Sequence, residues 1–450
     1  MSIDQAFSLK NLNKLLNEDR EKGGDLEERY IPEAYTLRTR IYELKKYKSL
    51  VRYKYRTGVA TAQLYELRTD RLNKVIKGRK ESHSTLVDTV LQRISGQISS
   101  KNFRVELNVL PAPIRDKTVY GVGRDLAQIL AIRFVQKILK DVYHIEMPPR
   151  DILVAQVKSL AMDGAPKIIL RADIESFYES VQHKDLLESI HQSPQLSVFV
   201  KRIITRLLSD YLKLSGTDRG LPRGVGISAY LSEIYLAYID TEVRRNNEIF
   251  YYARYVDDMI IMFAPKNKNK VNEYLTSFGE LLAKKGLSLN DKTKVLNLMD
   301  EQQGKFTYLG YEFDVSPSNR GVRMSTAKLK KYRERIEKSF NDYHAKVAFI
   351  PKKAARELIT RSLFLTGNMR LFNRKSNAFI GIYYSNKHIT ELSQLRGLDG
   401  FFLAKINLLT DTALKRKLSR LSFENGFIKK EFRNLSTKNL SEISRGWKHA

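Results

Sequence analysis

The sequence contains no cysteine among its 450 residues. Disulfides, thiolate zinc sites and cysteine nucleophiles are therefore excluded from its chemistry. A chain without cysteine fits a reducing compartment, and we expect a cytoplasmic protein. The first 24 residues lack the apolar core of a signal peptide, and no apolar run approaches the length of a membrane span. We therefore expect no membrane partner.

Acidic residues are scarce relative to basic ones. Lys and Arg number 79 against 50 Asp and Glu, a formal net charge of +29. Most of this excess lies in residues 316–450, which hold 29 Lys and Arg against 10 Asp and Glu. Apolar residues make up 42% of the chain, enough for two or three folded domains. A charge excess of this size predicts a polyanionic partner, of which nucleic acid is the commonest.

The hydrophobic pattern predicts helices around a small sheet. Helical spacing occurs at residues 7–21, 33–95, 125–143, 195–214 and 227–239. Strands are predicted at 103–122, at 306–315, in the apolar run "KIILRAD" (167–173) and in "YYARYVDDMIIMFA" (251–264), with a tight turn at its two acids. From residue 316 onward the pattern is mostly helical. This order indicates an α+β fold with a small antiparallel sheet backed by helices.

Three acids at predicted strand ends carry the chemistry. Asp173 closes an apolar strand, and Asp257 and Asp258 lie at a predicted turn 84 residues further on. Taken singly, such residues are more often helix caps or turn residues. If the two strands are neighbours, however, the carboxylates meet and need a counter-charge. Clustered hard oxygen ligands favour Mg²⁺, and two such ions can clamp the oxygens of a phosphoryl transfer.

Five segments occur in the order of the palm motifs of reverse transcriptases, and the chain resembles that family over about residues 100–315. The segments are "RADIESFYESV", "GLPRGVGISAYLSEIYL", "RYVDDMIIMF", "GLSLNDKTKV" and "YLGYEF". The resemblance implies a right-hand polymerase. Residues 1–99 would form an N-terminal helical region, 100–315 the fingers and palm, and 316–450 a helical thumb with a basic C-terminal extension.

The resemblance assigns the acids to metal binding. Asp173 and Asp257 resemble the two principal metal ligands, with Asp258 supporting them, and Ile174 resembles a position whose backbone touches the triphosphate. The implied cofactor is a pair of Mg²⁺ ions, for which Mn²⁺ could substitute.

A second group resembles nucleotide-binding positions. Tyr178 resembles the bulky steric gate that favours deoxynucleotides, although Phe177 is adjacent and one of the two rings could belong to the core. The loop with Gly220, Pro222, Arg223 and Gly224 resembles the one that shapes the nucleotide pocket; a plain turn before a helix would explain its glycines alone. Relatives more often have glutamine in place of Arg223, which leaves ordinary template handling in doubt.

The resemblance assigns three further groups of candidates. Tyr308, Leu309, Gly310 and Tyr311 resemble the primer grip. Lys292 resembles a general acid for pyrophosphate departure or is simply a solvated lysine, and its motif "LNDKT" is one residue shorter than expected. Arg115, Lys117 and Arg124 are candidates for triphosphate contacts, or a solvated basic face. The seven histidines are scattered, and we expect each to be a surface or core residue.

The expected function is RNA-directed DNA synthesis, a nucleotidyltransferase reaction with dNTPs, an RNA template and a DNA product. The segment 361–389 is similar to one in stand-alone bacterial reverse transcriptases of antiviral (antiphage) defence. Partners implied by that similarity are a dedicated noncoding RNA and a second reverse transcriptase or effector protein. Two alternatives stay open. One is template-independent or protein-guided DNA synthesis, suggested by Arg223, and the other is a catalytically idle RNA-binding scaffold.

Overall fold

The computed structural model describes residues 4–24, 26–113, 117–265, 270–299, 303–373, 376–436, 439–440, 442–443 and 447. The chain forms two compact units, each built from two segments. Unit 1 comprises Met1–Glu146 and Ser176–Tyr238, and unit 2 comprises Met147–Glu175 and Ile239–Ala450. Both units combine helices with strands, so the expected α+β class is confirmed. Within the described ranges, every helix is too short or too polar to span a bilayer.

Unit 1 is mostly helical. Its helical core lies around α5, whose buried residues include Leu130, Val135 and Leu139. Its only strand pair among the described residues is β1 with β2, which are antiparallel. The elements are α1 (Leu9–Glu21), α2 (Leu26–Tyr30), α3 (Pro32–Arg56), α4 (Ala62–Ser99), β1 (Leu107–Val109), β2 (Tyr120–Val122), α5 (Leu126–Val142), α7 (Phe177–Ser180), α8 (His183–Gln192) and α9 (Val198–Ser215). Helix α10 (Ile227–Arg244) begins in unit 1 and ends in unit 2.

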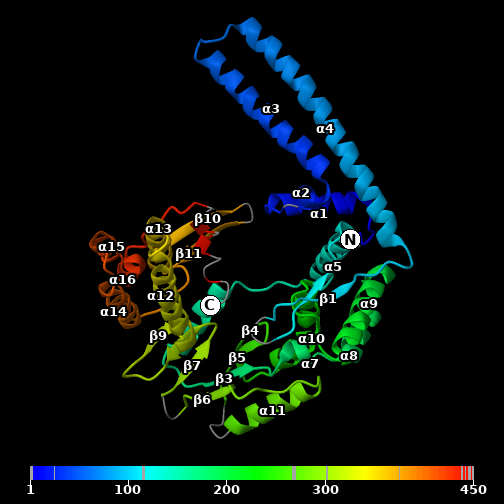
Figure 1. Ribbon diagram of the computed structural model, residues 1–450. Helices are drawn as coiled ribbons and strands as arrows, with labels where there is room; N and C mark the ends of the chain where they lie inside the picture. Colours follow the sequence, from blue (N-terminus) through cyan, green and yellow to red (C-terminus); the bar gives the residue numbers. More distant parts are fainter. Residues whose placement is uncertain are drawn as a thin grey trace. The chain divides into compact units, whose positions relative to one another are not determined.

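Helices α3 and α4 form a long antiparallel hairpin that extends away from α1, α2 and α5 (Figure 1). Its base is fixed by a buried acid. Glu27 in α2 is 2% exposed and pairs with Arg20 at 3.1 Å, Arg38 at 2.6 Å and His83 at 2.6 Å. These partners come from α1, α3 and α4, so one carboxylate joins all four helices. Removing it would leave the half-buried Arg20 and Arg38 without their shared carboxylate.

Unit 2 contains the four-stranded sheet that carries the predicted acids. Its order is β4 (Ile249–Tyr255), β5 (Asp258–Phe263), β3 (Ile168–Asp173) and β6 (Lys294–Asn297), with all neighbours antiparallel. Strand β3 is buried on both faces, because Ile168, Ile169 and Leu170 are each 0% exposed. Helix α11 (Val271–Ala283) contacts β6, and the rings of Phe263 and Tyr274 stack at 4.0 Å. The small antiparallel sheet predicted from the sequence is thus confirmed.

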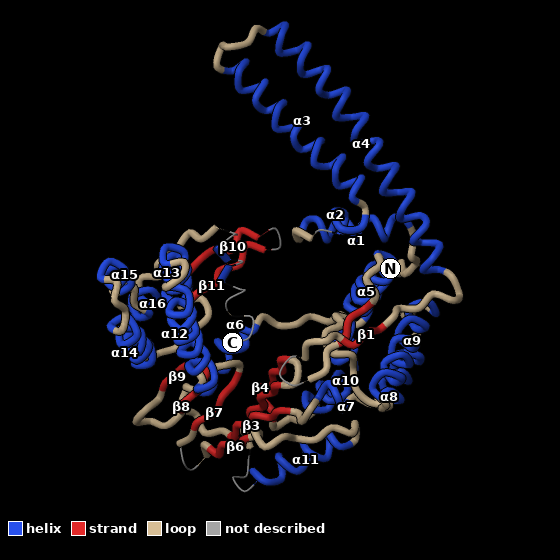
Figure 2. Tube along the Cα trace, in the orientation of Figure 1, coloured by secondary structure: helices blue, strands red, loops and turns tan. Residues whose placement is uncertain are grey.

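A second sheet and a helical bundle complete unit 2. The three-stranded sheet has the order β7 (Lys305–Tyr308), β8 (Tyr311–Asp314) and β9 (Gly321–Met324). The bundle includes α12 (Thr326–Val347), α13 (Pro351–Thr366), α14 (Ser393–Asn407), α15 (Thr412–Leu418) and α16 (Phe423–Ile428), which pack together (Figure 2). Helix α6 (Arg150–Ala161) shares its core. Sequence reasoning missed α6, β9 and the strand pair β10 (Asn368–Asn373) and β11 (Ser376–Gly381).

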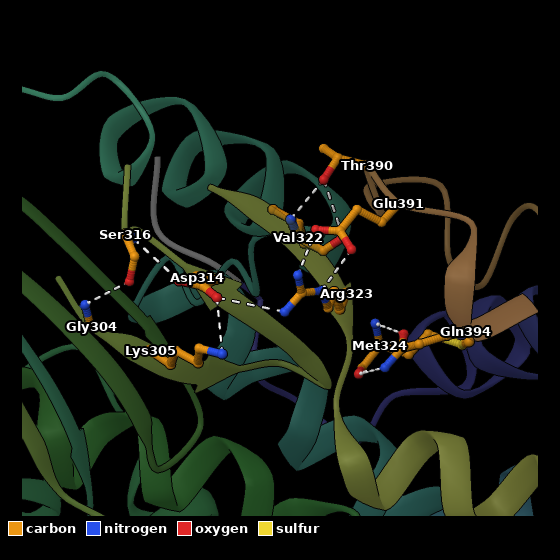
Figure 3. A network of polar contacts seen from close by, with 10 residues as sticks. All are labelled: Gly304, Lys305, Asp314, Ser316, Val322, Arg323, Met324, Thr390, Glu391 and Gln394. Carbon is orange, nitrogen blue, oxygen red and sulfur yellow. Dashed lines mark hydrogen bonds and ion pairs between the residues drawn. The ribbon is translucent and has the colours of Figure 1, made fainter. Parts of the chain in front are cut away.

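The three-stranded sheet is joined to the start of α14 by a polar network (Figure 3). Asp314 is 0% exposed and lies 3.0 Å from Lys305 and 3.5 Å from Arg323. Arg323 also donates two hydrogen bonds to Glu391, at 2.9 and 2.8 Å. Burial opposes ionisation of Asp314, but hydrogen bonds from Lys305 and Ser316 and the charge of Lys305 together lower its pKa. The network therefore fixes β8 and β9 against the segment that leads into α14.

Candidate active site

The structure brings two of the three predicted acids to one edge of the sheet. Strand β3 ends at Asp173, strand β5 begins at Asp258, and the antiparallel register pairs these two residues directly. Residues so opposed have Cβ atoms about 4.5–5.5 Å apart. Asp257 lies in the two-residue turn between β4 and β5. The two carboxylates are therefore neighbours across the strands, and the third is adjacent in the chain.

The turn that presents these acids has an unusual backbone. Its first central residue, Val256, has a φ of 61°. Tight hairpins require positive φ at this position and usually place glycine, asparagine or aspartate there. A β-branched residue in this region is a genuine outlier and costs roughly 1–3 kcal/mol. Strain is therefore stored directly beside Asp257 and Asp258.

A buried arginine supplies a counter-charge to the acids. Arg171, two residues before Asp173 in β3, is 8% exposed. Its Nη2 lies 3.0 Å from Oδ1 of Asp258 and 3.6 Å from Oδ1 of Asp173. The backbone carbonyl of Lys292 accepts a hydrogen bond from Nη1 of the same guanidinium, at 3.0 Å. The arginine is therefore held in place from a third segment of the chain.

The environment makes Asp258 a weaker acid than usual. Burial is the largest cause and raises the pKa of Asp258 to about 6, supported by repulsion from Asp173 and Asp257. Arg171 and a backbone hydrogen bond from Leu309 act in the opposite direction. This carboxylate is therefore short of positive charge even with Arg171 beside it.

The arrangement of the acids matches a cation-binding site only in part. No group of three or more His, Asp or Glu side chains converges on one point in the described ranges. Nevertheless, Oδ1 of Asp258 is buried and accepts no hydrogen bond from any described residue, although Arg171 forms an ion pair with it. A buried oxygen with a free lone pair beside a second carboxylate suits a hard cation such as Mg²⁺. The pair Asp173 and Asp258 thus offers the correct donors.

The four primer-grip candidates form the hairpin β7–β8. Tyr308 pairs with Tyr311, and the two residues between them both have positive φ, 45° for Leu309 and 75° for Gly310. This pattern is that of a type I′ turn. The amide of Leu309 donates a hydrogen bond to Asp258. The turn therefore directly contacts the end of the sheet that carries Asp173 and Asp258, here called the acid edge. Tyr308 is 1% exposed, and burial together with Asp258 raises its pKa.

A basic pocket of about 400 Å³ lies beside this hairpin in unit 2. Arg150 donates to the carbonyl of Leu309, and Nζ of Lys328 lies 4.5 Å from the centre of the Tyr311 ring. Burial, followed by the charge of Arg150, lowers the pKa of Lys328 to about 7. The pocket is lined by Arg150, Asp151, Val154, Tyr311, Lys328, Lys331, Tyr332, Arg335, Tyr384, Ser385 and His388.

The nucleotide-binding candidates of unit 1 form a cluster of their own. The Arg223 guanidinium lies 5.1 Å from the centre of the Tyr178 ring and donates to Glu179 at 2.9 Å. Lys117 lies 3.7 Å from the same carboxylate. Phe177 is 2% exposed whereas Tyr178 is half-buried, so Phe177 is the core aromatic of the two. The structure thus gathers Tyr178, Arg223 and Lys117 around Glu179.

The glycines of the loop at 220–224 have a steric reason. Gly220 and Gly224 each have a φ of 95°. A Cβ at Gly224 would lie 2.7 Å from the carbonyl oxygen of Tyr120, and one at Gly220 would lie 3.2 Å from that of Tyr178. Pro222 is buried, and its carbonyl accepts a hydrogen bond from Ser228 at 2.8 Å. The whole loop is therefore tied to its neighbours in unit 1.

The other predicted residues are placed as follows. Ile174 is 2% exposed and forms a β-bridge with Leu289. The side chains of Lys292 and Arg124 are exposed. Arg115 lies outside the described residues.

Sequence reasoning missed two residues that contact the acids. Arg171 could have been noticed as a charge inside an otherwise apolar strand. The side chain of Asn290 donates to Asp173, and its amide donates to the Asp173 carbonyl at 3.0 Å. Asn290 lies in the quoted segment "GLSLNDKTKV", but that pattern assigned it no role. Its role depends on the pairing of distant segments.

Comparison with known proteins identifies the central part of the chain. The family described as Reverse transcriptase (RNA-dependent DNA polymerase) matches residues 122–313. This range includes the three acids, the loop at 220–224 and the hairpin β7–β8 except for its last residue, Asp314. Residues 122–313 therefore match the domain of reverse transcriptases, which are RNA-directed DNA polymerases and so nucleotidyltransferases.

Solved structures with similarity to the chain include telomerases. One is an apo telomerase from Candida tropicalis truncated from its C-terminal domain, with 13% identity, covering 53% of this chain and 60% of that one, at a TM-score of 0.34. Another is the apo telomerase from Candida tropicalis, with 12% identity, covering 79% and 64%, at a TM-score of 0.38. A third, from Candida albicans with a fragment of telomeric RNA, has 13% identity, covers 70% and 53%, and has a TM-score of 0.30.

The chain spans about three fifths of the length of the first of these telomerases. The TM-scores are too low to support an inference about activity or partners. No protein with a curated description matches the chain significantly.

Proposed function

We propose, from the reverse transcriptase domain at residues 122–313, that the protein is an RNA-directed DNA polymerase that extends a 3′-hydroxyl with dNTPs. The observation that carries this proposal is the register of β3 and β5, which sets Asp173 opposite Asp258 with Asp257 in the adjoining turn. Residues 1–99, 100–315 and 316–450 then correspond to an N-terminal region, fingers with palm, and thumb with extension.

Asp173, Asp257 and Asp258 would hold two Mg²⁺ ions. When bound, these ions neutralise the triphosphate and lower the pKa of the primer hydroxyl. Arg171 supports this assignment, because it already provides positive charge at the same two carboxylates. Within unit 2, the hairpin β7–β8 would orient the end of the primer, and its hydrogen bond to Asp258 links primer position to the acids.

The residues of unit 1 would bind the incoming nucleotide. Tyr178 is the candidate for the ring that excludes a 2′-hydroxyl. Lys117 and Arg223 both face Glu179, and a triphosphate could replace that carboxylate as their anionic partner. Because Arg223 is engaged within this cluster, template-independent synthesis remains the second candidate. Sequencing of the DNA product distinguishes them: a product that copies no supplied RNA would contradict the templated reaction.

The test of the main proposal is primer extension on an RNA template with dNTPs and Mg²⁺. We expect Asp257→Asn combined with Asp258→Asn to reduce incorporation at least about a thousandfold, because the variant loses two carboxylates needed for charge stabilisation. Glu175→Gln, an exposed acid two residues after Asp173, is the matched control and should retain activity. Activity in the double variant, with circular dichroism unchanged, would refute the assignment.

An antiphage role is proposed on the similarity of segment 361–389 alone. The same double variant tests it in cells. Loss of protection in a plaque assay would tie defence to DNA synthesis, whereas protection by a stable but inactive protein would favour the RNA-binding scaffold.

A further inference from the structure

The charge excess of the chain lies in two separate regions. Residues 316–450 hold 29 Lys and Arg against 10 Asp and Glu, and residues 40–80 hold 13 against 3. The rest of the chain carries equal numbers of both signs. Residues 40–80, here called the hairpin tip, form the distal part of α3, the connecting turn and the start of α4. This second region lies outside residues 122–313 and has no role in the chemistry described above.

The hairpin tip has very little core. Among its residues only Ile41, Val51 and Ile76 are buried. The seam between the helices is itself partly polar, because Lys48 donates a hydrogen bond to Asn73 at 2.6 Å and Nε of Arg79 is buried without an acceptor among the described residues. By contrast, the buried residues Val87, Leu91, Ile94 and Ile98 of α4 all lie toward the base. The tip is therefore a thin, solvated structure that the core of unit 1 does not require.

Large rings are exposed on this solvated tip. Tyr42 is 69% exposed, Tyr53 64% and Tyr47 49%. Tyr42, Lys46 and Tyr53 are separated by four and seven residues, so they lie on one face of α3, about 16 Å long. Exposed Lys and Arg side chains surround them. Leaving tyrosines in water on an arm that buries so little is a feature of a contact surface.

We propose that the hairpin tip binds an unpaired segment of RNA. Its Lys and Arg side chains would contact phosphates, and Tyr42 and Tyr53 would stack on bases, as basic grooves with interleaved aromatics do on single strands. The phosphates of a duplex would contact the Lys and Arg side chains, but its bases are already stacked on one another and would not stack on the tyrosine rings. That the partner is a polyanion follows from the charge of the hairpin tip itself. The choice of RNA over DNA depends on the proposed function.

Charge makes a second copy of the chain a poor occupant of the same surface. With 13 basic and 3 acidic residues, two tips would bring together net charges of +10 each. An exposed apolar side chain such as Leu67, 70% exposed, could still serve a protein partner. A protein contact is therefore retained as an outcome of the test.

The experiment measures binding of a fluorescein-labelled, unstructured RNA by anisotropy, without dNTPs and with EDTA. The protein is full-length and carries Asp257→Asn and Asp258→Asn, so that binding is separated from synthesis. We expect the further pair Tyr42→Ala and Tyr53→Ala to weaken binding about tenfold or more for each stacked base lost. Three reversals, Lys46→Glu, Lys54→Glu and Lys74→Glu, should also reduce the slope of log K against log salt by about 0.7 per lost phosphate contact.

Matched controls use three exposed lysines elsewhere in unit 1, Lys140→Glu, Lys184→Glu and Lys213→Glu, which make the same change in net charge. Unchanged affinity in both tip variants, or equal losses in the tip reversals and these controls, would overturn the proposal. So would a change in sedimentation mass without a change in RNA affinity, which would indicate a protein contact. Equal binding of a single-stranded DNA would overturn the choice of RNA.

A failure of the proposed function gives a different result. In that case primer extension is absent from the parent enzyme, while RNA binding and its dependence on the tip persist. If both proposals hold, the same tip substitutions placed in the enzyme with Asp257 and Asp258 intact should leave extension of a short primer–template normal and weaken only binding of the longer RNA.

Discussion

At the scale of single residues, the acid edge depends on a charge to which the sequence motif assigns no role. Arg171 forms ion pairs with both Asp173 and Asp258, and its guanidinium donates a hydrogen bond to the carbonyl of Lys292. Without it, two carboxylates directly opposed on neighbouring strands would repel each other in a partly buried site. A divalent cation and Arg171 therefore serve the same electrostatic need.

Arg171→Met tests this equivalence. We expect the free energy of unfolding to fall by roughly 2–4 kcal/mol in EDTA, because a buried partner of two carboxylates is lost. Saturating Mg²⁺ should restore a large part of that loss, measured as the midpoint of urea denaturation. Arg254→Met, which removes a buried partner of Asp240 in the same unit, is the control. The loss of stability in Arg254→Met should be the same with and without Mg²⁺. If Mg²⁺ restored the stability of both variants equally, the equivalence of Arg171 and a divalent cation would be contradicted.

Lys328 makes a pH-dependent contribution to the free energy of unfolding. Its pKa is lowered to about 7 by burial and by Arg150, whereas an unfolded lysine titrates near about 10.4. Between these values the unfolded chain binds more protons, so stability from this group rises with pH. Other charged or titratable groups lining its pocket are Asp151, Lys331, Arg335 and His388.

The measurement compares the parent with Lys328→Met. Between about pH 6 and pH 9, the free energy of unfolding of the parent should rise by roughly 2 kcal/mol relative to the variant. Lys331→Met, an exposed position on the same helix, should follow the parent. A constant difference between parent and Lys328→Met across this range would exclude the effect.

At the scale of elements, the sequence predicted the strands and helices whose pattern is local. The alternation and apolar runs of 251–264, and the helical spacing of α5, α9 and α10, gave positions within a few residues. Strand β9 was missed because four residues after a turn give no clear period. Strands β10 and β11 lie in a region that the sequence pattern predicted to be helical. They pair with each other as a hairpin, and this pairing was not visible in the pattern.

The β4–β5 turn is an element under strain. Val256→Gly should raise the free energy of unfolding by roughly 1 kcal/mol, because relief of the positive φ outweighs the added entropy of glycine in the unfolded chain. Primer extension should fall at the same time, since a looser turn holds Asp257 and Asp258 less firmly. Thermal denaturation and extension assays would show this, and Val256→Ala, which keeps a Cβ, should fall short of the glycine variant. Lower stability of Val256→Gly would refute the strain.

The network around Asp314 should behave as a buried unit (Figure 3). Arg323→Met removes the link to Glu391 and leaves Lys305 as the one cation beside the buried Asp314 among the described residues, so we expect a loss of roughly 2–4 kcal/mol in urea denaturation. An exposed pair offers the contrast. Lys330 and Glu334 lie 3.9 Å apart on α12, and Lys330→Met should cost less than about 0.5 kcal/mol. Equal losses would show that burial does not matter here.

At the scale of the whole molecule, the sequence located the domain but not the contacts that complete it. The order of predicted strands and helices indicated the α+β class, and the acids stood out at predicted strand ends and in motifs that are each continuous in the chain. Arg171, Asn290 and the amide of Leu309 reach the acids only through pairing of β3 with β5 and β6 and through the placement of β7–β8. No local pattern records that pairing.

The charge distribution is also a property of the whole chain. Composition predicted a polyanionic partner and located the basic C-terminal third. It did not single out the hairpin tip, because residues 40–80 resemble any other Lys- and Arg-rich helical pattern until the structure shows how few of their side chains are buried.

The turn between α3 and α4 has a practical use. Val59 is 72% exposed at the end of the arm, and the chain contains no thiol. A single Val59→Cys substitution would therefore accept a maleimide dye at one defined position without removal of any native cysteine. With a second dye on a nucleic acid, energy transfer would act as a molecular ruler and record, one complex at a time, when that strand arrives and how long it stays.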